Sequence, residues 1–291
     1  MLAQFLQFLF SGVTVGAVYA LSALGFTLVY NASGVINFAQ GEFIMLGGMT
    51  TVSMMALGLP LWLAVLLAVV LTVLVGFALD KFAIEPARNA EVLVVIIITV
   101  GASIFIRGLA SIFLGKDQHA LPSFSGDEPI AILGATLLPQ SVWVLGVMLV
   151  VVVALGYFFS RTLLGKALLA TSCNPLAAQL VGININFALL LSFGLSAMLG
   201  AVGGILVAPI TLTSYDVGIM LGLKGFVAAV LGGLGTGRGA IFGGLILGVT
   251  EAMAAGYISS EYKDAVPFIL ILLILFFMPR GLFGARVTER V

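Results

Sequence analysis

Charged residues are scarce in this sequence. Asp, Glu, Lys and Arg together make up 8% of its 291 residues, whereas hydrophobic residues make up 62%. A water-soluble domain of this size needs far more polar surface. The composition therefore excludes an ordinary soluble protein and indicates an integral membrane protein. The formal net charge of zero gives no reason to expect nucleic acid as a partner.

The residue types that support catalysis and metal binding are equally sparse. His119 is the only histidine and Cys173 the only cysteine, so the sequence lacks a zinc-binding histidine pair and cannot form an internal disulfide. Gly165-Lys166 is followed by Ala167, and no Walker A phosphate loop occurs. We therefore predict a chain that is not an enzyme, binds no metal or cofactor, and depends on another subunit for any use of ATP.

Long apolar runs fill most of the chain. A perpendicular helix needs about 20 residues to cross a bilayer, so the shorter runs are candidates for half-helices or re-entrant segments. Continuous runs also exclude a β-barrel. We predict an all-α integral membrane protein, a polytopic bundle of about eight transmembrane helices with Gly- or Asn-broken segments, forming one domain over 1–291. The runs lie at 5–30, 42–58, 61–79, 92–114, 141–159, 184–208, 220–234, 240–258 and 265–279.

Lys and Arg are distributed unevenly between the two sides of this bundle. One side is formed by residues 80–91, 160–183, 235–239 and the C-terminal tail, and we call it the first side. The opposite, second side clearly contains only Lys116 and Lys263. By the positive-inside rule, the first side and the C-terminus are cytoplasmic. The N-terminus is then outside if all the runs cross the membrane, and inside if one of them does not. The first side carries Lys81, Arg88, Arg161, Lys166, Arg238, Arg280, Arg286 and Arg290.

The polar loop at 160–183 contains the signals of a short helix outside the membrane. Asn174 is a favoured N-cap, Pro175 suits the first helical position, and Gly182 suits the left-handed residue after the helix. A helix of about two turns is therefore expected. A docking surface for a soluble protein and burial in the headgroup layer explain its apolar face equally well. That face comprises Leu176, Gln179, Leu180 and Ile183.

Two interruptions break the apolar runs. Asn37 and Gln40 have the spacing of a capping box, which predicts a new helix near Phe38. A glycine-rich stretch at 232–239 breaks another run. Broken segments often meet solute in transporters, and tight turns between helices are the alternative. The polar candidates for solute contact are Asn31, Asn37 and Gln40.

The glycines near the C-terminus have small-xxx-small spacing, which lets helix backbones approach closely in lipid. They are Gly235, Gly239, Gly243, Gly244 and Gly248. The stretch 235–240 also matches the loose dinucleotide pattern G-x-G-x-x-A, but it lacks the preceding strand, so we interpret it as a packing motif.

Three ionisable residues within the apolar runs, Glu42, Arg107 and Glu251, should face protein or water. Glu42 fits the first turn of a helix, where its charge suits the dipole. A proton-relay carboxylate is the alternative for this residue.

Several ordered motifs resemble one family over nearly the whole chain. Residues 25–30 and 34–42 resemble the first signature of bacterial branched-chain amino acid ABC transporter permeases of the LivH type. Residues 224–235 and 243–248 resemble the second signature. The C-terminal marks of the family resemble residues 261–264 and 278–281.

The resemblance implies an importer permease subunit that moves branched-chain amino acids across the bacterial inner membrane. It implies three kinds of partner: a second, related permease, two cytoplasmic ATPase subunits that hold ATP and Mg²⁺, and a periplasmic solute-binding protein. The translocation-path candidates are then Asn31, Asn37, Gln40 and Glu42. Sister permeases for urea, short amides or aromatic carboxylates remain alternatives, as does an ion-coupled secondary transporter or channel that uses Glu42 or Glu251.

The resemblance also implies that the segment from Arg161 to Gly182 couples the permease to the ATPases. Ala177-Ala178-x-x-x-Gly182 is similar to the importer pattern Glu-Ala-Ala-x-x-x-Gly, although Leu176 stands in place of Glu. The coupling candidates are Arg161, Lys166, Asn174, Pro175, Leu176, Ala177, Ala178, Leu180 and Gly182.

Overall fold

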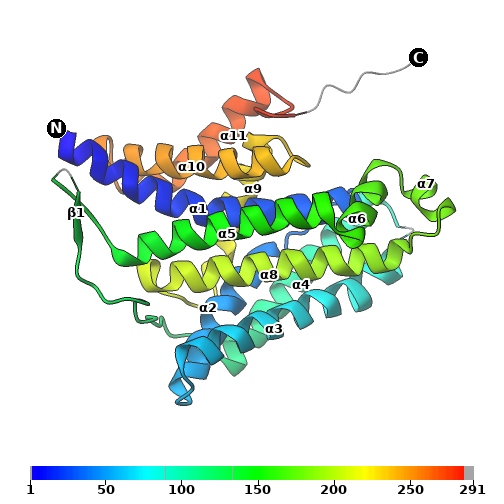
Figure 1. The fold of residues 1–291 in the computed structure, drawn as a ribbon, viewed down its shortest axis with the longest axis horizontal. Coiled ribbons are helices and arrows are strands. Elements are labelled where there is room, and N and C mark those ends of the chain that lie inside the picture. The colour runs from blue at the N-terminus through cyan, green and yellow to red at the C-terminus, as the bar shows by residue number, and fades with distance from the viewer. Residues whose placement is uncertain (1, 89, 133, 285–291) are drawn as a thin grey trace.

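The structure is a computed structural model that describes residues 2–88, 90–132 and 134–284. Arg286 and Arg290, which contribute to the predicted orientation, lie outside the described residues. Within the described ranges the chain forms a bundle of helices and one small β-hairpin (Figure 1). The helices are α1 (Leu2–Ser33), α2 (Gln40–Ala56), α3 (Leu61–Leu79), α4 (Val92–Phe113), α5 (Pro139–Arg161), α6 (Leu163–Cys173), α7 (Pro175–Leu180), α8 (Ile185–Thr211), α9 (Val217–Gly232), α10 (Gly237–Tyr257) and α11 (Val266–Phe277).

Three short helical segments and two strands complete the fold. A π-helical turn, η1 (Asp80–Ile84), and a 3-10 turn, η2 (Glu85–Ala87), extend α3, and η3 (Lys263–Ala265) precedes α11. Strands β1 (Ile130–Ile132) and β2 (Ala135–Leu137) pair antiparallel, with Ala131 opposite Thr136.

Each predicted apolar run coincides with one helix, which confirms the all-helical polytopic bundle. Six helices in the described chain are long and apolar enough to cross a membrane: α1, α3 with its extension, α4, α5, α8 and α10. The remaining runs form shorter helices, α2 with 17 residues, α9 with 16 and α11 with 12. The expected mixture of full spans and shorter segments is therefore present.

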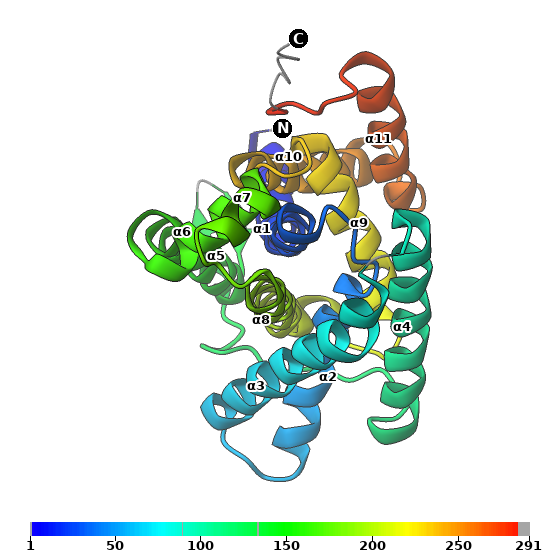
Figure 2. The same cartoon turned by 90° about the vertical axis from the view of Figure 1, so that its right-hand side faces the viewer.

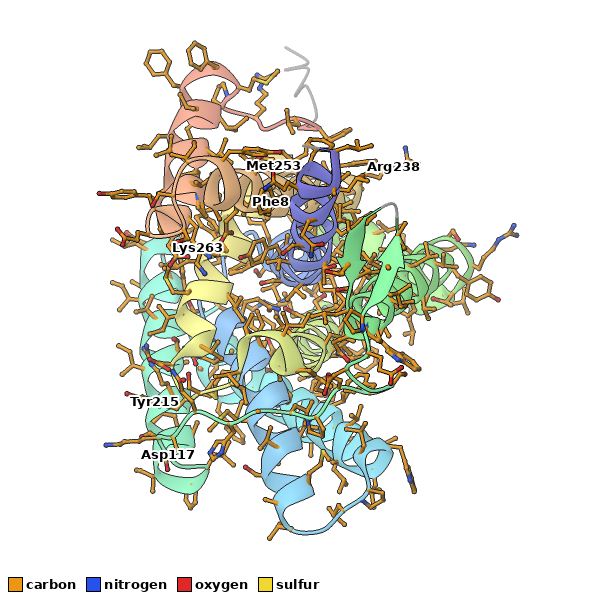
Figure 3. The ribbon with its side chains drawn as sticks, turned by 90° about the vertical axis from the view of Figure 1, so that its left-hand side faces the viewer. Phe8, Asp117, Tyr215, Arg238, Met253 and Lys263 are labelled. Atoms are coloured by element: carbon orange, nitrogen blue, oxygen red, sulfur yellow. The ribbon has the colours of Figure 1, made fainter. Side chains whose placement is uncertain are left out.

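The bundle has two distinct ends along its long axis (Figure 1). The α7 end carries α6, α7 and the end of α1, and the hairpin end carries β1, β2 and the start of α1. Arg88, Arg161, Lys166 and Arg238 belong to segments at the α7 end. The segments that join α4 to α5 and α10 to α11, which contain Lys116 and Lys263, lie toward the hairpin end (Figure 1). Figure 3 views the bundle from that end and labels Asp117 and Lys263 in these two segments. The two groups of basic residues therefore lie toward opposite ends of the bundle.

Helix α1 forms the centre of the core. Figure 2 shows it enclosed by α5, α8, α9 and α10. Its side chains from Ala17 to Leu21 are almost fully buried. A membrane helix that is surrounded by other helices in this way needs small residues wherever the backbones approach one another.

Glycines on α10 provide these close approaches, as their spacing predicts. A Cβ on Gly244 would collide with Ala20 of α1, and one on Gly248 would collide with Gly12 and Gly16. Gly239 and Gly243 instead pack on α9, against Gly232 and Ala228. Gly235 does not belong to this set, because it lies in the turn before α10 with φ 91°.

A new helix, α2, does begin near Phe38 as predicted, but its predicted capping box is wrong. The helix begins at Gln40, two residues beyond Phe38, and no capping box forms. Asn37 Oδ1 accepts from the nearby Ala39 N–H at 3.1 Å, whereas the Gln40 side chain points into the bundle and donates to the Ser196 carbonyl at 3.2 Å. The Gln40 side chain, which the spacing predicts as part of the cap, therefore forms a tertiary contact instead.

The loop at 160–183 contains two helices rather than one. Thr162 Oγ1 accepts from the Gly165 N–H at 3.0 Å and so caps α6, which the sequence analysis missed. The sequence does contain its signal, because Leu164 and Leu168 follow this N-cap at i, i+4 spacing.

Candidate functional site

Helix α7 is defined at both ends by local hydrogen bonds. Asn174 Oδ1 accepts from the Ala177 N–H at 3.0 Å, and Pro175 occupies the first helical position. At the other end Gly182 has φ 87°. The Gly182 N–H donates to Gln179 O and the Ile183 N–H to Ala178 O, both at 3.0 Å, which is the Schellman pattern. The predicted short helix, its cap and its terminating glycine are thus confirmed.

The apolar side chains of α7 are largely exposed. Leu176 is 74% exposed and Leu180 is 89% exposed, whereas Ala178 faces inward and is 2% exposed. Val181 extends this surface, being 76% exposed. Ile183 does not belong to it, because the helix ends before Gly182 and Ile183 is half-buried. We call Leu176, Leu180 and Val181 the α7 face.

Basic residues lie at the same end of the bundle as the α7 face. Arg161 ends α5 and Lys166 lies in α6, and both are exposed. Neither forms an ion pair with another described residue. A partner that covers the α7 face can therefore also contact free positive charge.

A cavity of about 830 Å³ separates α7 from the end of α3 and of α1. Pro175, Leu176 and Gln179 line one side, and Ile84 and Arg88 line the other. Helix α7 packs on α6, to which Asn174 joins it directly, and a short connection leads from it to α8, whose first turn is capped by Asn184.

The polar candidates for solute contact occupy different surroundings. Asn31 Nδ2 donates to Gly235 O at 2.9 Å and lines a cavity of about 610 Å³ at the α7 end. Asn37 and Gln40 are almost fully buried, at 1% and 0% exposed. Ser196 Oγ donates to Gln40 Oε1 and to Gly25 O, which ties α8 to α2 and α1. These three residues and Glu42, the fourth candidate, therefore do not line one common cavity among the described residues.

Glu42, the fourth candidate, lies in the first turn of α2, as expected for a carboxylate that suits the helix dipole. It is 1% exposed. Ser103 Oγ of α4 donates to its Oε1 at 2.7 Å, while Oε2 faces Gly218 of α9 and has no hydrogen-bond partner among the described residues. Arg107 lies one turn beyond Ser103 on the same face of α4.

A buried charge network, which the sequence analysis did not assemble, connects α1, α9, α10 and η3. Lys224 Nζ lies 2.6 Å from Glu251 Oε1 and 2.6 Å from Asp264 Oδ1. Tyr19 Oη donates to Glu251 Oε2 at 2.9 Å. The hydrogen bond from Lys224 holds the pKa of the Asp264 carboxyl below its usual value. The signal in the sequence is one lysine and one glutamate within neighbouring apolar runs, each of which requires a partner.

The comparisons with known proteins agree with one another. The family described as "Branched-chain amino acid transport system / permease component" matches residues 8–275. LivH, a high-affinity branched-chain amino acid transport system permease protein of Escherichia coli, is 37% identical over 99% of this chain and 98% of its own. BraD, the corresponding permease protein of Pseudomonas aeruginosa, is 34% identical over 99% of this chain and 98% of its own.

A solved structure supports the fold independently. PsaBC from Streptococcus pneumoniae, in complex with Fab, matches with a TM-score of 0.53 and 16% identity over 97% of this chain and 98% of that chain. At this identity the likeness concerns the fold alone. The family match and the near-full-length relatives go further, and the chain belongs to the family of branched-chain amino acid transport system permease components.

Proposed function

We propose that this chain is the permease subunit of an ATP-binding-cassette importer that moves branched-chain amino acids across the bacterial inner membrane. The observation that carries the proposal is the 37% identity to LivH of Escherichia coli over 99% of the chain. The chain acts as one membrane domain with a second, related permease. A periplasmic binding protein delivers the amino acid at the hairpin end, and the C-terminus is cytoplasmic.

The α7 face supplies the coupling to two cytoplasmic ATPase subunits, which hold ATP and Mg²⁺. Exposed leucines on a capped helix suit docking into a groove of a soluble partner. ATP binding biases the permease only if the contacts between α7 and the ATPases differ between the outward-open and inward-open states. The short connection from α7 to α8 transmits such a difference to the core. Helix α8 packs on α1, α2 and α3, so its movement rearranges the centre of the bundle.

The test is an ATPase assay in nanodiscs. The tagged permease is purified with the subunits encoded beside it and mixed with candidate binding proteins loaded with leucine, urea or an aromatic acid. Hydrolysis stimulated by the leucine-loaded protein supports the proposal. Stimulation only by a binding protein loaded with urea or an aromatic acid would show that the permease moves that solute instead. Transport that follows an ion gradient without an ATPase would contradict the assignment as an ATP-driven importer.

Asn31, Asn37, Gln40 and Glu42 are the proposed polar contacts along the path. Replacing Asn31, Asn37 and Gln40 singly by Ala is expected to lower the leucine uptake rate, because the solute then loses one hydrogen bond worth about 0.5–1.5 kcal/mol. Initial uptake rates in vesicles over a range of leucine concentrations measure this. Gln118→Ala, at an exposed amide in the loop after α4, is the control. Unchanged kinetics in all three variants would remove these residues from the path.

A further inference from the structure

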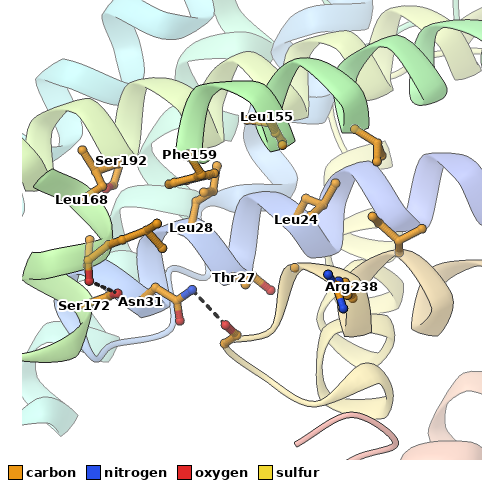
Figure 4. A pocket seen from close by; sticks show the side chains of 17 residues that line it. Leu24, Thr27, Leu28, Asn31, Leu155, Phe159, Leu168, Ser172, Ser192 and Arg238 are labelled. Carbon is orange, nitrogen blue, oxygen red and sulfur yellow. Dashed lines mark hydrogen bonds between the residues drawn. The ribbon is translucent and has the colours of Figure 1, made fainter. Parts of the chain in front are cut away.

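The cavity of about 610 Å³ at the α7 end is a groove along the side of α1. Leu24, Thr27 and Leu28 of α1 form its floor, and α5, α6 and the first turns of α10 form its walls (Figure 4). This volume lies within the range of about 300–1,000 Å³ that is typical of ligand sites.

The walls of the groove are apolar and continue onto the outer surface of the bundle. Leu155 and Phe159 of α5 line the groove, and Ile241 of α10 lines the other side. The neighbouring outer residues Val153 and Phe242 are 62% and 49% exposed. In a membrane-spanning bundle such exposed apolar side chains contact lipid chains, so the groove borders the hydrocarbon region.

The polar side chains of the groove come from α1, α6, α8 and the start of α10: Thr27, Asn31, Ser172, Ser192 and Arg238. Arg238 is exposed and forms no ion pair with a described residue. Thr27 is 3% exposed, and its Oγ1 has no hydrogen-bond partner in the described part of the chain. A buried, unpartnered hydroxyl in an apolar cavity indicates a ligand with an acceptor oxygen.

The charge of the groove selects between two kinds of amphiphile. Its lining residues include one guanidinium and no Asp or Glu. A zwitterionic amino acid would find no carboxylate for its ammonium group there, only neutral acceptors such as Asn31 Oδ1, whereas the phosphate of an anionic amphiphile would meet the guanidinium. Basic pockets between transmembrane helices on the cytoplasmic side suit anionic headgroups, and the α7 end is the end that the positive-inside rule assigns to the cytoplasm.

We propose that this groove binds an anionic phospholipid of the cytoplasmic leaflet. One acyl chain occupies the apolar channel over Leu24 and Leu28, the phosphate pairs with Arg238, and the Thr27 hydroxyl donates to an ester oxygen. The bound lipid fills the space between α1 and the α5–α6 pair. Asn31 also lines this groove, so a lipid bound here and a solute contact at Asn31 exclude one another, and displacement of the lipid by leucine decides between them.

The test is native mass spectrometry of the permease purified with its neighbouring subunits from nanodiscs that contain phosphatidylglycerol and phosphatidylethanolamine. Wild-type protein is expected to retain phosphatidylglycerol selectively. Arg238→Gln should reduce this selectivity about five-fold. Gly156→Leu should abolish retention, because Gly156 lines the groove and a Cβ there meets no atom within 4 Å, so the side chain fills the channel without displacing backbone.

Gly146→Leu is the matched control. Gly146 lies on the same helix, is also exposed, and also has open space around a Cβ, but it lies outside the groove. It should retain lipid as the wild type does. Equal retention in Gly156→Leu and wild type would overturn the proposal, and so would displacement of the lipid by leucine, which would make the groove a solute vestibule. Cross-linking of Gly156→Cys to the second permease would likewise assign the groove to a protein partner.

Discussion

Replacement of Lys224 by Met is expected to destabilise the folded protein by about 3–5 kcal/mol. Lys224 is 6% exposed and Glu251 is 7% exposed, so removing the ammonium group leaves a carboxylate without its counter-charge inside the bundle. The Glu251 side chain is almost shielded from solvent, so little water reaches it in place of the lost partner. The Tyr19 hydroxyl alone stabilises Glu251 far less than a cation at 2.6 Å.

The same network ties together parts of the chain that are distant in sequence. Lys224 lies on α9, Glu251 on α10 and Asp264 in η3, and Tyr19 brings in the central helix α1. The variant should therefore loosen the packing of α9 and α11 together. Thermal unfolding in detergent, followed by circular dichroism and by protease sensitivity of the segment after α10, measures both effects.

Two further variants separate charge pairing from packing. Lys263→Met removes an exposed lysine that forms no ion pair with a described residue, although it adjoins Asp264, and should leave stability unchanged. Glu251→Gln added to Lys224→Met should recover most of the loss, because a neutral amide needs no counter-charge and still accepts from Tyr19. A double variant as unstable as the single one would show that Lys224 acts through packing alone.

Much of the fold is predictable because its signals are local. A long apolar run produces a membrane helix wherever it occurs, so each run appears as a helix. Glycine spacing on one helix likewise places Gly244 and Gly248 on a common face, whatever their partner. The α7 boundaries follow from Asn174, Pro175 and Gly182, whose capping bonds span only a few residues.

The sites are less predictable because they depend on contacts between segments that are far apart in the chain. Gln40 has the spacing of a capping residue, yet Ser196, 156 positions away, binds its side chain. Lys224 pairs with Asp264, which lies 40 positions away, after α10. Ile183 fits the apolar spacing of α7 but follows the left-handed Gly182, and so it turns away from the face. Spacing within one segment does not reveal any of these outcomes.

Replacement of both Leu176 and Leu180 by Asp is expected to abolish ATPase docking and binding-protein-stimulated hydrolysis. These side chains are 74% and 89% exposed in the isolated chain. Burying a leucine fully contributes about 1.5–3 kcal/mol, so losing two corresponds to at least about 100-fold in affinity. Two carboxylates placed in an apolar groove add a desolvation cost. Co-purification of the ATPase subunits and hydrolysis in nanodiscs measure docking and coupling separately.

The control distinguishes docking to a protein from burial in the headgroup layer. Leu163 on α6 lies at the same end of the bundle and is 86% exposed, so Leu163→Asp introduces the same change outside the α7 face. If α7 lies in the headgroups, the double variant should lower stability in lipid while the ATPases still co-purify and hydrolysis stays coupled. If α7 docks the ATPases, the double variant should remain folded but lose them, while Leu163→Asp keeps them. Intact coupling in the double variant would remove the α7 face from the mechanism and leave Arg161 and Lys166 as the remaining candidate contacts at that end.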